Sequence, residues 1–159
     1  MKKLLSCLLA LVMSLSFLTG CGDAVADEFE EFLNTNMATV NAKYEDLTAE
    51  LLKWSSFETD AEMIDSLSNI ILPNIDEEIA MVNAIEVATE EVNAIKEKFL
   101  SMLDKYKEGY SAMLSALETA DVTALENALT VVEEGLAVLE EYNKALEDLA
   151  KEKELTVEY

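Results

Sequence analysis

The chain has 159 residues, enough for one domain with a sizeable core, and its hydrophobic content of 51% excludes wholesale disorder. Its 33 acidic residues and 11 lysines give a net charge of −22, which disfavours nucleic acid and anionic lipid headgroups as binding partners. The sequence lacks His, the commonest general base and metal ligand, and lacks Arg, the residue best suited to clamp phosphate or carboxylate.

The first twenty residues have the features of an export signal. Lys2 and Lys3 precede an apolar run from Leu4 to Leu18, which ends in small residues. This run is shorter than the roughly 20 residues that a membrane-spanning helix needs. We therefore predict a signal peptide at residues 1–20 and a single mature domain at residues 21–159.

The end of this leader is more specific than an ordinary cleavage site. An aliphatic residue, a small residue, a glycine and a cysteine follow one another as Leu18, Thr19, Gly20 and Cys21. This order resembles the lipobox of bacterial lipoproteins. The resemblance implies a diacylglycerol on Cys21, cleavage before Cys21, and a protein anchored by lipid to the extracytoplasmic face of the cell membrane. An ordinary signal peptide that happens to end near a cysteine is the alternative.

Removal of the leader changes the charge and the thiol content of the chain. Lys2 and Lys3 leave, whereas every acidic residue follows Cys21, so the mature net charge becomes −24. Cys7 also leaves and Cys21 carries lipid, so no thiol remains for a disulfide, a metal site or a nucleophile. The mature domain must then be held together by its hydrophobic core.

The first part of the mature sequence predicts one long helix and one short helix. An apolar stripe predicts a helix from about Ala24 to Ser55, with Asp23 as its N-cap. Thr59 and Glu62 form a capping box that starts a short helix, which Pro73 ends or kinks because it lacks an amide proton. The stripe consists of Leu33, Met37, Val40, Tyr44, Leu47, Leu51 and Trp54.

Apolar residues recur every seven positions through the middle of the chain, where Gly109 is the only stop signal. Asn74 marks a new helix start, and we predict one continuous helix from Ile75 to Glu118, roughly 65 Å long at 1.5 Å per residue. The column consists of Ile85, Val92, Phe99, Tyr106 and Met113.

The last helix is predicted from about Val122 to Glu154, with Asp121 as its cap and a tail from Leu155 to Tyr159. Apolar sevens sustained this long indicate coiled-coil-like packing, and short connections make neighbouring helices antiparallel. We therefore predict an all-α antiparallel bundle of three long helices and one short helix. The alternative is a conventional four-helix bundle, which requires a turn near Ala88 to Glu90.

An acidic column lies on the last predicted helix and is a candidate site for a cation or a basic protein partner. It consists of Glu126, Glu133, Glu140 and Glu147. The simpler interpretation is a solvated face with surface ion pairs to Lys144 and Lys151. Exposed parallel carboxylates do not form the closed oxygen cage that Ca²⁺ prefers, and a ferritin-like site would require histidines. We therefore predict no metal centre.

Aromatic and amide side chains provide the other candidates. Trp54 and Phe57 flank the first break, either as an anchor for a partner or as a plug at the end of the bundle. Several Asn residues near the apolar stripes either line a ligand pocket together with tyrosines or fix the helix register. These residues are Asn36, Asn83, Asn93 and Asn143, with Tyr44, Tyr106 and Tyr142.

These features favour a binding protein over an enzyme. We find no activated nucleophile and no tuned acid–base pair, and we expect neither catalysis nor a cofactor. Beyond the leader, the architecture resembles that of small helical bacterial lipoproteins, many of which have no assigned activity. We expect a non-catalytic interaction module that meets the membrane through the lipid on Cys21. The alternative is a carrier or sensor that binds a small ligand or cation within the bundle.

Overall fold

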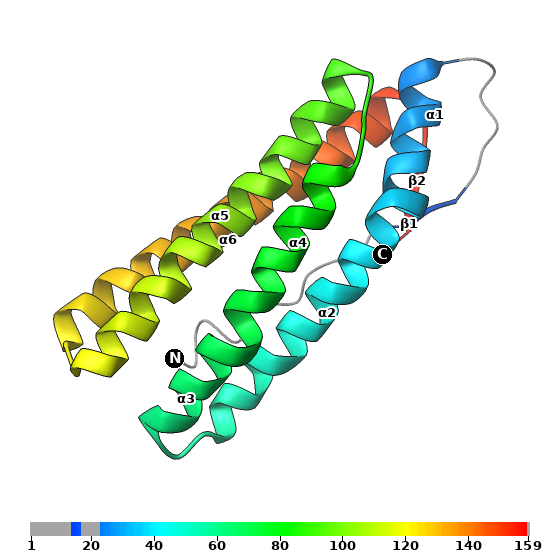
Figure 1. The fold of residues 1–159 in the computed structure, drawn as a ribbon. Coiled ribbons are helices and arrows are strands. Elements are labelled where there is room, and N and C mark those ends of the chain that lie inside the picture. The colour runs from blue at the N-terminus through cyan, green and yellow to red at the C-terminus, as the bar shows by residue number, and fades with distance from the viewer. Residues whose placement is uncertain (1–13, 17–22, 159) are drawn as a thin grey trace.

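The computed structural model describes residues 14–16 and 23–158, which form a helical bundle (Figure 1). Four rods in this described part run alternately up and down, joined by short connections at residues 57–59, 85–89 and 120–121. The predicted all-α antiparallel bundle is therefore confirmed, and its connectivity is that of the four-helix alternative.

The first rod consists of α1 (Ala24–Glu31), a π-helical turn η1 (Phe32–Asn36), α2 (Met37–Lys53) and a 3₁₀ turn η2 (Trp54–Ser56). The second rod consists of α3 (Asp60–Ser66), a π-helical turn η3 (Leu67–Ile71) and α4 (Leu72–Ala84). The third and fourth rods are the single helices α5 (Glu90–Thr119) and α6 (Val122–Glu152). Two short strands, β1 (Ser14–Ser16) and β2 (Thr156–Glu158), pair antiparallel.

The predicted continuous helix from Ile75 to Glu118 is wrong. Helix α4 ends at Ala84, because Ile85 adopts an extended conformation with ψ of 117°. Thr89 is also extended, with ψ of 146°, and is the N-cap residue of α5. The sequence here contains neither Gly nor Pro, so it shows no local signal for a turn, and the heptad pattern continues across it. Side chains distant in the sequence stabilise this turn.

Of the two expected effects of Pro73, an end or a kink, the end is wrong because the second rod continues through it, and Asn74 does not start a new helix. The rod instead changes its hydrogen-bond register just before the proline, where the Leu72 amide donates to the carbonyl of Leu67, five residues earlier. Pro73 therefore lies in the first turn of α4, where a missing amide proton is tolerated best. The π-helical turn η3 is thus the local adjustment that lets the helix continue.

Three of the predicted helix starts are confirmed in detail. The Asp23 carboxylate accepts from the amide of Val25, and the Asp121 carboxylate accepts from the amide of Ala124, each at 3.0 Å. Thr59 and Glu62 make the reciprocal bonds of a capping box. The last helix ends within two residues of its predicted end, but the predicted tail is partly wrong because it contains β2.

The core runs along the inner faces of all four rods. Rings bridge the bundle at its middle: Tyr44 of α2 lies 6.2 Å from Phe99 of α5, which lies 5.2 Å from Tyr142 of α6, between ring centroids. Helices α5 and α6 pack closely at Gly109 and Gly135. A Cβ atom on Gly135 would come within 2.6 Å of the Tyr106 ring. These two glycines therefore permit a helix spacing that alanine would not.

Candidate functional site

The predicted lipidation residue Cys21 and the motif residues Leu18, Thr19 and Gly20 lie outside the described residues. The first described residue after them is Asp23, the N-cap of α1. Its carboxylate also forms an ion pair at 3.0 Å with Lys153, the residue that follows the end of α6. The first and last rods are therefore joined at the end of the bundle that is closest in sequence to Cys21.

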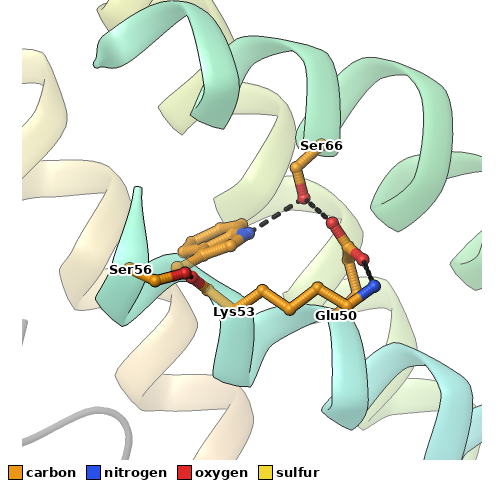
Figure 2. Close-up of polar contacts among 5 residues, drawn as sticks. Glu50, Lys53, Ser56 and Ser66 are labelled. Atoms are coloured by element: carbon orange, nitrogen blue, oxygen red, sulfur yellow. Dashed lines mark hydrogen bonds and ion pairs between the residues drawn. The ribbon is translucent and has the colours of Figure 1, made fainter. Parts of the chain in front are cut away.

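Trp54, one of the two candidate anchor residues, lies at the opposite end of the first rod and is half-buried. Its indole nitrogen donates to the Ser66 hydroxyl at 2.9 Å (Figure 2). Its ring meets the Tyr110 ring edge-on, with ring centroids 5.8 Å apart. The structure thus uses Trp54 to join the first rod to the second rod and to α5. Phe57 is also half-buried, and Leu52, two residues before Trp54, is 51% exposed.

A buried carboxylate completes this network. Glu50 accepts from the Ser66 hydroxyl at 2.8 Å and from the Lys53 ammonium group at 2.6 Å (Figure 2). Burial would raise the pKa of Glu50, but the hydrogen bonds from Lys53 and Ser66 outweigh burial and hold the pKa below its ordinary value. Glu50 therefore stays charged at neutral pH and orders the end of the bundle that carries Trp54.

The four residues of the acidic column, Glu126, Glu133, Glu140 and Glu147, are all exposed on α6. Two neighbouring acids of the same helix bind lysines of α5: Glu134 pairs with Lys105 at 2.8 Å, and Glu141 pairs with Lys98 at 3.3 Å. Among the described side chains, no group of three or more Asp, Glu, Cys or His residues is placed to hold a metal ion. The column is thus a charged outer face of α6, adjacent to the α5–α6 ion pairs.

The Asn and Tyr candidates do not converge as one set. Asn83 and Asn93 are exposed, and Asn36 and Asn143 are half-buried. The three tyrosines are buried. Burial raises the pKa of Tyr44 well above its usual range, and the neighbouring Tyr106 phenol offsets part of this shift. Asn74 of α4, which is also half-buried, donates to the backbone carbonyl of Lys43 at 3.4 Å.

The most unusual polar group, Glu78 of α4, was not predicted from the sequence. Its side chain is fully buried, and neither carboxylate oxygen has a hydrogen-bond partner among the described residues. Burial raises its pKa to about 8 and outweighs the opposing effect of Lys43. A signal existed in the sequence, because Ile71, Ile75, Glu78 and Val82 follow steps of four, three and four along one buried helix face.

Two further side chains with a structural role were also missed, both at the connection between α4 and α5. Glu28 of α1 accepts from the backbone amides of Ala88 and Thr89 and from the Thr89 hydroxyl. Lys96 of α5, which is 9% exposed, donates to the carbonyl of Ile85 at 2.6 Å. These bonds satisfy backbone groups at the end of α4 and the start of α5, so a turn forms without turn residues.

Comparisons with protein-family models, with curated proteins and with solved structures give no match to this chain. Within residues 14–16 and 23–158, none of the helices combines the length and the apolar character that crossing a membrane requires.

Proposed function

We propose that the protein is a lipid-anchored, extracytoplasmic helical module that acts by binding a partner and not by catalysis. The observation that carries this proposal is the order Leu18, Thr19, Gly20 and Cys21 at the end of a short basic and apolar leader. The structure adds that the helical bundle begins immediately afterwards, at the N-cap Asp23. A motif in this position leaves the whole bundle on the exported side of the cleavage site.

The position of the anchor would fix the orientation of the bundle. Two peptide units separate Cys21 from Asp23, so their Cα atoms lie at most about 7 Å apart. The end of the bundle that contains Asp23, Lys153 and the α4–α5 connection would therefore face the membrane (Figure 1). Trp54 would lie roughly 45 Å away along the first rod, at 1.5 Å per residue.

This orientation separates two surfaces that a partner could use. The exposed acids of α6 run along the bundle and would attract a basic protein over long distances. The half-buried Trp54 and Phe57, with exposed Leu52, lie at the membrane-distal end and would supply apolar contacts. We propose a basic protein partner that the charge steers and the apolar end selects.

The anchor is tested by Cys21→Ser in the native host, with metabolic labelling by a fatty-acid analogue. We expect the wild-type chain to be labelled and shortened, and the variant to remain an unlabelled precursor. Cys7→Ser is the matched control and should be labelled like the wild type. A label that persists in Cys21→Ser contradicts the lipoprotein proposal.

The partner surface is tested by crosslinking and pull-down at low and high salt. A triple variant Glu133→Lys, Glu140→Lys, Glu147→Lys should slow capture at low salt, because it removes the steering field. A double variant Trp54→Ala, Phe57→Ala should lose the partner at both salt concentrations, because apolar contacts are not screened. Equal capture by all three proteins at both salt concentrations would show that neither surface is the binding site.

A further inference from the structure

The interior of the bundle contains one carboxyl group whose charge state the packing controls. Glu78 lies on the inner face of α4 between Ile75 and Val82, which are also fully buried. Its two oxygens receive no hydrogen bond from the described residues. A neutral carboxyl group is tolerated in such a place, whereas an unpaired carboxylate is strongly disfavoured there.

The charged groups around Glu78 do not supply a partner for an ionised carboxylate. Lys43 of α2 is the cation that acts on it electrostatically, but the Lys43 ammonium group is bound to Glu77 on the bundle surface. Asp76, on the same helix, is bound to Lys107 of α5 at 2.7 Å. Because both lysines are paired with surface carboxylates, neither ion pair gives an ionised Glu78 a positively charged partner.

The remaining titratable neighbours are phenols, which do not ionise in the neutral range. Tyr44 of α2 interacts electrostatically with Glu78, and burial raises the pKa of Tyr44 above its ordinary value. Tyr106 and Tyr110 of α5 lie beside Tyr44, and Tyr142 of α6 lies one ring further, against Phe99. Glu78 is thus the group at the junction of these rods that can change its charge between mildly acidic and mildly alkaline pH.

We propose that Glu78 is a proton-operated switch: its carboxyl group is neutral when α4 is packed against α2 and α5, and its ionisation loosens this packing. The cation that the Glu78 carboxylate binds and releases in this switch is a proton. Loosening would let water or the Lys43 ammonium group reach the carboxylate. The proposal does not depend on the lipid anchor, because its residues all lie within the bundle.

The second rod is held by hydrogen bonds at both of its ends, on either side of Glu78. The α4–α5 connection is fixed from α1 by Glu28 and from α5 by Lys96. The other end of the second rod is fixed by the Ser66 bonds to Glu50 and Trp54. Glu78 lies between these two fixed ends, so we expect a local loss of rigid packing with the helices retained.

The experiment follows the circular dichroism of the full-length chain in a non-ionic detergent from about pH 6 to about pH 9. The near-ultraviolet signal reports how rigidly the tyrosines are held, and the far-ultraviolet signal reports helix content. In the wild type we expect the first signal to fall and the second to persist. Where loosening of one molecule releases one proton, the ratio of packed to loosened molecules should fall about tenfold for each unit that the pH rises.

Glu78→Gln should abolish this transition, because the amide has almost the same shape and cannot ionise. Glu78→Leu should abolish it as well and serves if the amide variant does not fold. Glu77→Gln is the matched control on the exposed face and should keep the transition. A wild-type signal that is flat over this range, or a transition that persists in a folded Glu78 variant, would overturn the proposal.

A direct measurement on the wild type decides the matter even if both variants fail to fold. The ¹³C resonance of the Glu78 carboxyl group, assigned through its side chain, should titrate near pH 8. Titration together with the surface glutamates in the acidic range would overturn the proposal.

Discussion

The carboxylate of Glu28 in α1 accepts hydrogen bonds from both the backbone amide and the hydroxyl of Thr89, the N-cap residue of α5. The two residues are 61 positions apart in the chain. Glu28 thus performs the task that a local capping residue performs at other helix starts, and it places a negative charge at the positive end of the α5 dipole. One contact therefore both caps a helix and joins the first rod to the third.

Replacing Glu28 by Gln should lower the free energy of unfolding by about 1–3 kcal/mol, as expected for losing hydrogen bonds to a charged group. Glu31→Gln changes an exposed residue of the same helix and should cost less than about 0.5 kcal/mol. Urea unfolding followed by circular dichroism measures both variants. Equal losses would mean that Glu28 does not cap α5.

The acid side of the stability profile should depend on the same carboxylate. Burial raises the pKa of Glu28, but its bonds from Thr89 and Ala88 outweigh burial and leave the pKa lowered, as for Glu50. Such groups stabilise the fold above the pKa of the unfolded chain, about 4.3, and this stabilisation is lost as the pH falls through the folded pKa. Unfolding measured between about pH 6 and pH 3 should therefore be flatter with pH in a Glu28→Gln, Glu50→Gln variant than in the wild type.

The difference between Thr59 and Thr89 shows why some helix starts could be predicted and one could not. Thr59 and Glu62, three residues later, cap each other in a reciprocal capping box, and this spacing is visible in the sequence. Thr89 is capped by Glu28, and no pattern within a window of sequence shows that contact. The apolar sevens continue through Ile85 and Val92 regardless, because Ile85 packs against the core from the α4–α5 connection and Val92 belongs to the core from α5.

In the candidate site, too, properties set by helix periodicity could be predicted, whereas properties set by contacts between helices could not. The exposure of Glu126, Glu133, Glu140 and Glu147 follows from helix periodicity, which also predicts the burial of Leu139. Glu78 occupies an apolar column and could have been recognised from its spacing. That its carboxylate receives no bond depends on how α2 and α5 pack against α4, which the sequence does not specify.

Leu139→Ala should lower the free energy of unfolding by about 2–5 kcal/mol, because the side chain is 7% exposed within the core and its removal leaves a cavity. Glu140→Ala, one position further on the exposed face, should cost less than about 0.5 kcal/mol. Thermal and urea unfolding of both variants would check the helical phase of α6. Similar losses at the two positions would mean that this phase is wrong.

Ala120→Gly should stabilise the protein. Ala120 ends α5 in a left-handed conformation, with φ of 52° and ψ of 34°, which a residue with a Cβ atom adopts at a cost. Glycine relieves this cost, and we expect a gain of about 1 kcal/mol in the free energy of unfolding. Ala112→Gly, at an exposed position inside α5, should instead lose about 0.5–1 kcal/mol. A loss in Ala120→Gly would contradict the left-handed end of α5.

Gly135→Ala should destabilise the protein, although alanine is the better helix former by about 1 kcal/mol. A Cβ atom at Gly135 would lie 2.6 Å from Cδ1 and 2.7 Å from Cε1 of Tyr106. The Tyr106 ring is fully buried and packs against Tyr110, with ring centroids 6.0 Å apart, so it cannot move aside freely. We expect a loss of about 1–3 kcal/mol, the usual cost of overpacking a core. Ala137→Gly, at an exposed position of the same helix, isolates the propensity effect and should cost about 1 kcal/mol. A higher unfolding midpoint for Gly135→Ala would contradict the close approach of α5 and α6 at Gly109 and Gly135.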